Sequence, residues 1–335
     1  MLAQRITIIL ALVLGILVDG GPRAHAEGGL RIAEQFGIAF LPLHVIRDQQ
    51  LIEKHARNRG LPVVTEWSKL SGGASMNDAL LSGSIDIAIG GIGPVLTIWD
   101  RTKGNAEVKA IAALGSLPSF LVTRNPDVKT LKDFSKTDKI ALPAVGVSVQ
   151  AKTLQIAAER EFGIGKHGAL DSITVTLPHP DATAALLSGS TEINAHFSNP
   201  PFQYQALENP KVHKVLSSYD VVGGPATSNI AYTTTKFRRD NPQTYAVFLA
   251  ALKDAIAWIN ANKPAAAGTY IRVEKSRLDP ALIRSIVENP DARYTPVPER
   301  TFIYAEFLAR TGSIKTKAKS WTDYFFPDIH DLPGN

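Results

Sequence analysis

The chain has 335 residues, of which 44% are hydrophobic and 20% are charged, and it contains no cysteine. This composition excludes a disordered chain, a collagen-like chain and a disulfide-stabilised scaffold. The 36 Lys and Arg against 31 Asp and Glu give a formal net charge of +5, and because the basic residues form no long run, we do not expect a nucleic-acid partner.

Residues 1–26 have the pattern of a secretory signal peptide. Arg5 precedes an apolar run from Ile6 to Val18, and Ala24-His25-Ala26 fits the small-x-small pattern before a cleavage site. The run is too short for a bilayer core, which needs about 20 residues. We therefore expect cleavage near Ala26 and export to a periplasm; a buried N-terminal helix is the alternative.

Residues 30–89 predict alternating strands and helices. In order, they are a strand at 30–33, a helix from about 42 to 58, a strand at 63–67, a helix that ends at Gly83 and a strand at 85–89. Ser75 is a good candidate for the N-cap of the second helix, because its hydroxyl can accept a bond from an early helical N–H. Glycine is a favoured residue at a helix C-terminus.

A second copy of this order follows. Leu80-Leu81-Ser82-Gly83-Ser84 recurs unchanged at 186–190, and Asp181 stands where Ser75 stands in the first copy. Around it we predict a strand at 139–142, a helix that begins at the 146–148 turn and runs to about 162, and strands at 173–177 and 192–197. A five-residue match can arise by chance, but the shared order on both sides favours a duplication. Strands that alternate with helices predict a mostly parallel, doubly wound sheet in each copy.

Two further strands connect the copies. Residues 109–123 predict a strand that crosses to the second unit, and 229–234 predict a returning strand, followed by helices at 242–262, 279–289 and 298–310. We predict a first lobe from 27–117 and 227–335, and a second lobe from 118–226. Two lobes joined by two crossings form a hinged clamshell that can close around a ligand.

The chain resembles the substrate-binding proteins of nitrate/sulfonate/taurine-type ABC importers, which are related to binders of thiamine precursors. The likeness covers essentially the whole mature chain, and its most specific parts are Gly72-Gly73 with 79–88, 141–150 and 186–202. It implies an α/β clamshell like that of periplasmic binding proteins, which captures a small solute and delivers it to an inner-membrane permease. Asn194 stands where the family often has Asp, and Asn199-Pro200-Pro201 also departs from the family pattern. The resemblance therefore does not identify the solute.

Ligands of such sheets collect outside the carboxyl ends of the strands, where helix N-termini offer unpaired N–H groups to anions. Five loops qualify: 40–42, 72–75, 91–94, 146–150 and 178–181. From these loops and the following strand ends we predict the ligand contacts Phe40, Leu41, Gly73, Ala74, Ser75, Gly93, Val147, Ser148, Gln150, His179, His196 and Asn199.

Each of these residues also has a structural alternative. The glycine-containing loops can be ordinary turns, and Ser148 can serve only as a helix cap. His179 can have a surface or capping role, and His196 can be a buried structural histidine. Phe40 can be a core residue.

The loops contain many helix N-termini and no obvious carboxylate cluster, so we expect an anionic solute such as a sulfonate, nitrate or organic carboxylate. We expect no metal or cofactor, because the histidines lack metal-ligand spacing and neither a phosphate-binding loop nor H-E-x-x-H occurs. The partners expected are the solute and the permease, with the protein acting as a monomer.

Two alternatives to an importer receptor stay open. Gly146-Val147-Ser148-Val149-Gln150 resembles the G-x-S-x-G elbow without its last glycine, so a hydrolase that uses Ser148 is one. A solute receptor that serves a sensor kinase is the other, and it would have the same fold and pocket.

Overall fold

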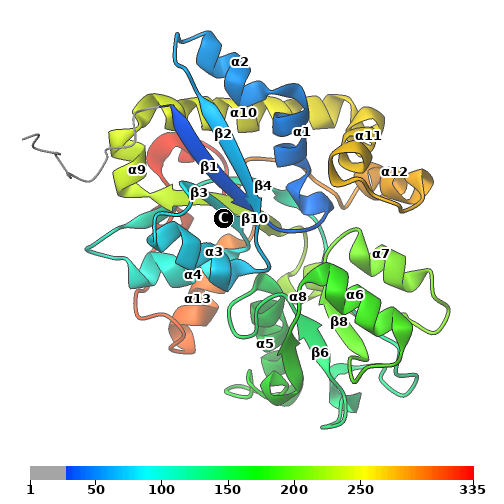
Figure 1. The fold of residues 1–335 in the computed structure, drawn as a ribbon. Helices are drawn as coiled ribbons and strands as arrows, with labels where there is room; N and C mark the ends of the chain where they lie inside the picture. The colour runs from blue at the N-terminus through cyan, green and yellow to red at the C-terminus, as the bar shows by residue number, and fades with distance from the viewer. Residues whose placement is uncertain (1–27) are drawn as a thin grey trace, which may run out of the picture.

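The computed structural model describes residues 28–335, and the predicted signal peptide lies outside the described residues. Residues 28–335 form two lobes, each built on one five-stranded sheet (Figure 1). The lobe drawn in green holds the second sheet, and the remaining colours meet in the other lobe. None of the described helices is long and apolar enough to cross a membrane.

The first sheet has the strand order β2-β1-β3-β10-β4. Its strands are β1 (Gly29–Glu34), β2 (Val64–Lys69), β3 (Ile87–Gly90), β4 (Val108–Ser116) and β10 (Thr227–Thr234). Strand β1 pairs in parallel with β2 and β3, whereas β10 runs antiparallel to β3 and β4. The sheet is therefore mostly parallel, and its one reversed strand is the strand that returns from the other lobe.

The second sheet repeats this arrangement with the order β7-β6-β8-β5-β9. Its strands are β5 (Phe120–Thr123), β6 (Ile140–Leu142), β7 (Thr174–Thr176), β8 (Ala195–Ser198) and β9 (His213–Ser217). Strand β6 is parallel to β7 and β8, and β5 is antiparallel to β8 and β9. The chain changes sheets between β4 and β5 and again between β9 and β10, which are the segments where the sequence analysis places its lobe limits.

Helices cover both sheets. Those near the first sheet are α1 (Leu41–Gln49), α2 (Leu51–Arg57), α3 (Gly73–Leu81), α4 (Ile92–Arg101), α9 (Thr235–Asp240), α10 (Pro242–Ala261), α11 (Lys263–Glu274), α12 (Pro280–Glu288) and α13 (Thr301–Arg310). Those of the second lobe are α5 (Val149–Phe162), α6 (His179–Ser188), α7 (Phe202–Leu207) and α8 (Ser218–Val222). Helix α10 confirms the predicted helix at 242–262, and its Val247, Leu252, Ile256 and Ile259 are buried as the helical spacing requires.

The two repeat units share an anchoring contact. The Arg31 backbone N–H donates to Asp86 Oδ2 at 2.8 Å, and the Lys139 backbone N–H donates to Asn194 Oδ1 at 3.0 Å. Each acceptor lies just before the strand that follows the repeated helix. Because an amide oxygen accepts this bond as well as a carboxylate oxygen does, Asn194 fills the same structural position as Asp86.

Some predicted boundaries are wrong. The helix expected at 42–58 is two helices, because Gln50 adopts a left-handed conformation with φ of 52°. The strand expected at 109–123 is β4 and β5, separated where the chain passes between sheets. Ser75 and Asp181 are not N-caps: α3 and α6 begin two residues earlier, after Gly72 and Pro178. The Ser75 hydroxyl instead donates to the Gly72 carbonyl at 2.9 Å.

The two crossings between the lobes lie side by side. The Ser119 backbone N–H donates to Ser218 Oγ at 2.9 Å, and the Ser218 N–H donates to the Ser119 carbonyl at 2.8 Å. Helix α13 also bridges the lobes, since Tyr304 Oη is 2.8 Å from Thr153 Oγ1 on α5. These contacts leave the lobes facing each other across the carboxyl ends of their parallel strands.

Candidate functional site

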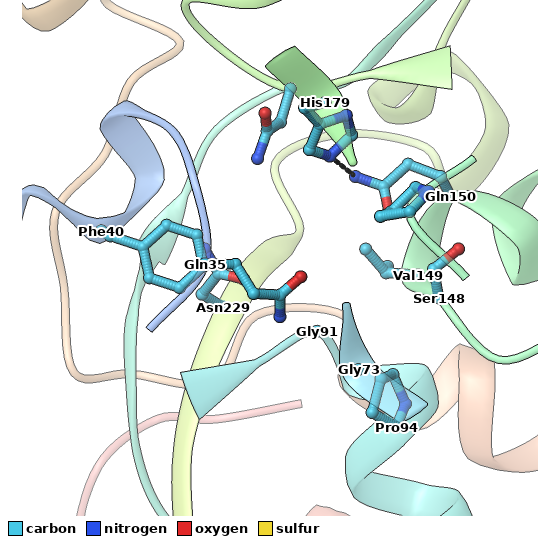
Figure 2. A pocket seen from close by; sticks show the side chains of 12 residues that line it. Gln35, Phe40, Gly73, Gly91, Pro94, Ser148, Val149, Gln150, His179 and Asn229 are labelled. Carbon is cyan, nitrogen blue, oxygen red and sulfur yellow. Dashed lines mark hydrogen bonds between the residues drawn. The ribbon is translucent and has the colours of Figure 1, made fainter. Parts of the chain in front are cut away.

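A small cavity lies between the lobes (Figure 2). It is lined by Gln35, Phe40, Gly73, Gly91, Pro94, Pro143, Ser148, Val149, Gln150, His179, Asn199 and Asn229. In Figure 2, Gln35, Phe40 and Asn229 from the first lobe face His179, Gln150 and Val149 from the second. Both lobes therefore contribute walls to one site.

Four helix N-termini meet at this cavity. Gly73 is the first residue of α3 and Gly91 precedes α4, while Ser148 precedes α5 and His179 is the first residue of α6. A helix N-terminus carries unpaired backbone N–H groups and a partial positive charge. Two such ends from each lobe give the cavity a positive electrostatic character without a cationic side chain.

Glycines allow these N-termini to approach closely. A Cβ on Gly73 would stand 2.1 Å from Pro94 Cγ, so only glycine lets the starts of α3 and α4 pack together here. Three other glycines of the first lobe contact the second lobe. A Cβ on Gly72 would lie 2.4 Å from the Pro143 carbonyl oxygen, and a Cβ on Gly91 would lie 2.8 Å from Val149 Cβ. A Cβ on Gly93 would lie 2.2 Å from the Val147 carbonyl oxygen.

Two buried amides in the cavity wall have unpaired polar atoms. Among the described residues, Asn229 Nδ2 and Asn199 Oδ1 have no hydrogen-bond partner, although these residues are only 6% and 7% exposed. A buried polar group without a partner costs free energy, so such groups are candidates to bond a ligand. The amide of Gln35 is already engaged, because Nε2 donates to the Ile89 carbonyl at 3.3 Å.

A buried chain of polar side chains forms the wall of the second lobe. Gln150 Nε2 lies 3.5 Å from His179 Nε2, and His179 Nδ1 lies 2.9 Å from His196 Nε2. Burial lowers the pKa of His179 to about 3. Burial, and then the neighbouring His179, also lower the pKa of His196 well below 6.5. Both imidazoles are neutral at pH 7, so no lining side chain of the cavity has a formal charge.

The structure brings six of the predicted contacts to the cavity and leaves six out. Those in the lining are Phe40, Gly73, Ser148, Gln150, His179 and Asn199. His196 lies behind His179, and Leu41 is buried in the core. Ala74 is exposed and Ser75 partly exposed in the first turn of α3. Gly93 and Val147 contact each other across the lobes instead of lining the cavity.

Sequence reasoning did not single out Gln35, Pro143 or Asn229. Gln35 directly follows β1 and Pro143 directly follows β6, so the strand-end rule applies to both. Asn229 lies near the amino end of β10. That end reaches the cavity because β10 runs antiparallel to β3, which the sequence does not reveal.

Ser148 acts as a helix cap. Its Oγ accepts a hydrogen bond from the Ala151 backbone N–H at 3.1 Å, as the cap of α5. His179 also lines the cavity, but its own partners are Gln150 and His196, and no Asp or Glu belongs to the lining formed by residues 28–335. A Ser-His-acid arrangement is therefore not assembled here.

The sequence matches the model of the NMT1-like family over residues 36–272. No curated protein sequence matches the chain.

Several solved structures share the two-lobed fold. The alkanesulfonate-binding protein SsuA from Xanthomonas axonopodis pv. citri is 15% identical with a TM-score of 0.69, over 87% of this chain and 96% of that one. The aliphatic sulphonate binding protein SsuA from Escherichia coli is 18% identical with a TM-score of 0.64, over 89% and 99% of the two chains. The nitrate-binding protein NrtA from Synechocystis PCC 6803 is 15% identical with a TM-score of 0.68, over 88% and 83%. At this identity the likeness establishes the fold alone, and it confirms the predicted two-lobed α/β clamshell.

Proposed function

The chain belongs to the NMT1-like family, and we propose that it is the periplasmic solute-binding protein of an ABC importer that captures a small anion between its lobes. Of three solved proteins with the same fold, two are named as sulfonate-binding proteins and one as a nitrate-binding protein, and two of the three names include the word periplasmic. The signal peptide predicted at residues 1–26 supports the same compartment.

The convergence of four helix N-termini on an uncharged cavity carries this proposal. Oriented N–H groups and helix dipoles favour an anion, and no carboxylate in the lining opposes it. The unpaired Asn229 Nδ2 adds a side-chain donor. A cationic solute would find none of the carboxylates that it needs.

The apolar part of the lining indicates the kind of anion. Phe40, Pro94, Pro143 and Val149 share the wall with the polar groups. The cavity is narrow, because residues of both lobes close around it. We infer an organic sulfonate or carboxylate with a short apolar part, whose acid group faces the helix N-termini.

Binding would act by shifting the lobes between open and closed arrangements. The solute contacts one lobe first, and the groups of the other lobe complete its hydrogen bonds when the lobes close. The shift is limited by the difference in affinity between the two arrangements. The closed form is the form that would dock on the permease.

A panel of solutes tests the sign of the expected charge. Thermal unfolding of the purified protein should shift upward with ethanesulfonate, taurine, nitrate or propionate, and should not shift with ethylammonium of similar size. Stabilisation by ethylammonium alone would overturn the proposal.

Two other observations address the alternatives. Absence of product after prolonged incubation with the stabilising solute would distinguish binding from Ser148-dependent hydrolysis. Genes for a permease beside this one would distinguish import from sensing.

One variant tests the site itself. Asn229→Asp keeps the size of the side chain but replaces its donor with a carboxylate. Because a hydrogen bond to a charged group contributes about 1.5–3 kcal/mol, we expect the anion to bind roughly 10–100-fold more weakly in calorimetric titration. Asn105→Asp makes the same chemical change at an exposed turn and should leave affinity unaltered. Equal losses in both variants, or no loss in either, would contradict the assignment.

A further inference from the structure

A second cluster of polar groups lies in the first lobe, beside the cavity but outside it. Glu34 is the last residue of β1, His44 lies in α1 and Glu274 is the last residue of α11. The backbone continues from Glu34 directly to Gln35, which lines the cavity. Glu34 and His44 are fully buried, and Glu274 is largely buried.

The arrangement matches a metal-ligand triangle. His44 Nε2 lies 3.5 Å from Glu34 Oε2 and 3.2 Å from Glu274 Oε1. One ligand atom from each of the three residues can be chosen so that all lie within 4.8 Å of one another. Nitrogen and oxygen ligands at about 2.0–2.2 Å from a tetrahedral Zn²⁺ are about 3.3–3.5 Å apart. The two printed separations fall close to that value.

These groups also lack hydrogen-bond partners. Within the described residues, both carboxylate oxygens of Glu34, both ring nitrogens of His44 and Oε1 of Glu274 are buried and make no hydrogen bond. The contacts from His44 to the two carboxylates are close but not aligned as hydrogen bonds. Unsatisfied buried groups are rare in folded proteins, and a bound ion is one explanation for several of them at one point.

We propose that Glu34, His44 and Glu274 form a site for a divalent transition-metal ion such as Zn²⁺. One imidazole and two carboxylates are a ligand set that such ions accept, with a solvent molecule able to complete the shell. The metal would tie the end of α11 and the first turns of α1 to the carboxyl end of β1.

Two cations hold the carboxylates on their outer sides. Arg47 Nη1 lies 3.3 Å from Glu34 Oε1, and Lys69 Nζ lies 2.5 Å from Glu274 Oε2. The other oxygen of each carboxylate is the one near His44, and Arg47 Nη2 also lies 3.7 Å from that oxygen of Glu274. The Lys69 contact fixes the orientation of the Glu274 carboxylate from outside, as is usual for metal ligands.

The site would stiffen the wall of the cavity. Beyond Glu34, the Phe36 carbonyl accepts a bond from Asn199 Nδ2 at 3.3 Å, and the Ile38 N–H donates to the Pro200 carbonyl at 2.8 Å. The segment next to the metal ligands is thus the segment that contacts the second lobe. The sequence did not predict this site, because its residues lie on three elements far apart in the chain.

Metal titration of the full chain tests the proposal. Protein without a polyhistidine tag, dialysed against a chelator, should bind one equivalent of Zn²⁺ in competition with a chromophoric chelator. Co²⁺ should give the visible bands of a four- or five-coordinate site. Glu274→Gln should weaken Zn²⁺ binding by at least about 10–100-fold, the loss that follows removal of an outer partner alone. His44→Gln should do the same.

Matched variants serve as controls. Glu288→Gln and His55→Gln change exposed or half-exposed residues of the same types, and Zn²⁺ affinity should stay as in the parent chain. If His44→Gln fails to fold, the less buried Glu274→Gln still decides the matter. Zn²⁺ binding that Glu274→Gln leaves intact, an octahedral Co²⁺ spectrum or no stoichiometric binding would overturn the proposal. Thermal stability that does not respond to Zn²⁺ would likewise overturn it.

Discussion

We expect the substitution Gly93→Ala to hinder closing of the lobes while the chain still folds. Gly93 lies in the first turn of α4, and a Cβ there would be 2.2 Å from the Val147 carbonyl oxygen and 3.3 Å from that of Ser148. Both are backbone atoms of the second lobe, so no side-chain rotation relieves the clash. An ordinary contact begins near 3.4 Å, and the lobes would have to move apart by about 1.2 Å at this point.

Such a displacement is enough to break hydrogen bonds from one wall of the cavity. A donor–acceptor distance near 2.9 Å would lengthen beyond any hydrogen-bonding range. The loss of one or two bonds to a charged solute, at about 1.5–3 kcal/mol each, weakens binding by at least about 10-fold. The stability of the folded chain should not fall much, because alanine favours a helix over glycine by about 1 kcal/mol.

Calorimetric titration with the solute that stabilises the parent chain, combined with thermal unfolding, measures both quantities. Gly268→Ala is the matched control. It is also a helical glycine, and an added Cβ there would meet only Arg272 Nη1 at 3.5 Å. Parent-like affinity in Gly93→Ala would refute the reasoning that this contact belongs to the ligand-bound form.

Two further predictions concern the second lobe. Stability should be intact above pH 6.5. As the pH drops from 6.5 toward 3, it should fall by about 1.4 kcal/mol per pH unit for His179, and His196 should add to this loss. The unfolded chain takes up protons at both residues, whereas the buried imidazoles of the folded chain stay neutral. Denaturant midpoints across this range measure the effect, and a His179→Gln, His196→Gln double variant that kept the full slope would contradict it. Ser148→Ala removes the cap bond to Ala151 and should cost about 1 kcal/mol, lowering the melting temperature by about 2–4 °C in a thermal scan; an unchanged melting temperature would argue against the capping role.

The sequence predicts the order of elements well because the signals are local. Hydrophobic periodicity marks α10, and the repeated Leu-Leu-Ser-Gly-Ser segment marks the ends of α3 and α6. Helix starts are harder to predict. Ser75 and Asp181 are good capping residues, yet α3 and α6 begin earlier, after Gly72 and Pro178.

The candidate site is only partly predictable for a different reason. Ser148 and His179 follow from the rule that ligands collect at strand ends. Asn229 reaches the cavity only because β10 is reversed within the sheet. Gly93 and Val147 lie in the expected loops, but their atoms meet one another. Which loop residues face the cavity depends on how two lobes pack, and this is a property of contacts between distant parts of the chain.

Distance measurement between the two lobes tests the central claim most directly. The chain has no cysteine, so Val64→Cys and Ile164→Cys introduce unique labelling positions on exposed residues of opposite lobes. Without solute, pulsed electron–electron double resonance between spin labels at these positions should show a broad distribution or a longer distance than in the presence of solute. Saturating solute should give one shorter, narrower distance. A distribution that a tightly bound solute leaves unchanged would contradict the claim that the two lobes close around it.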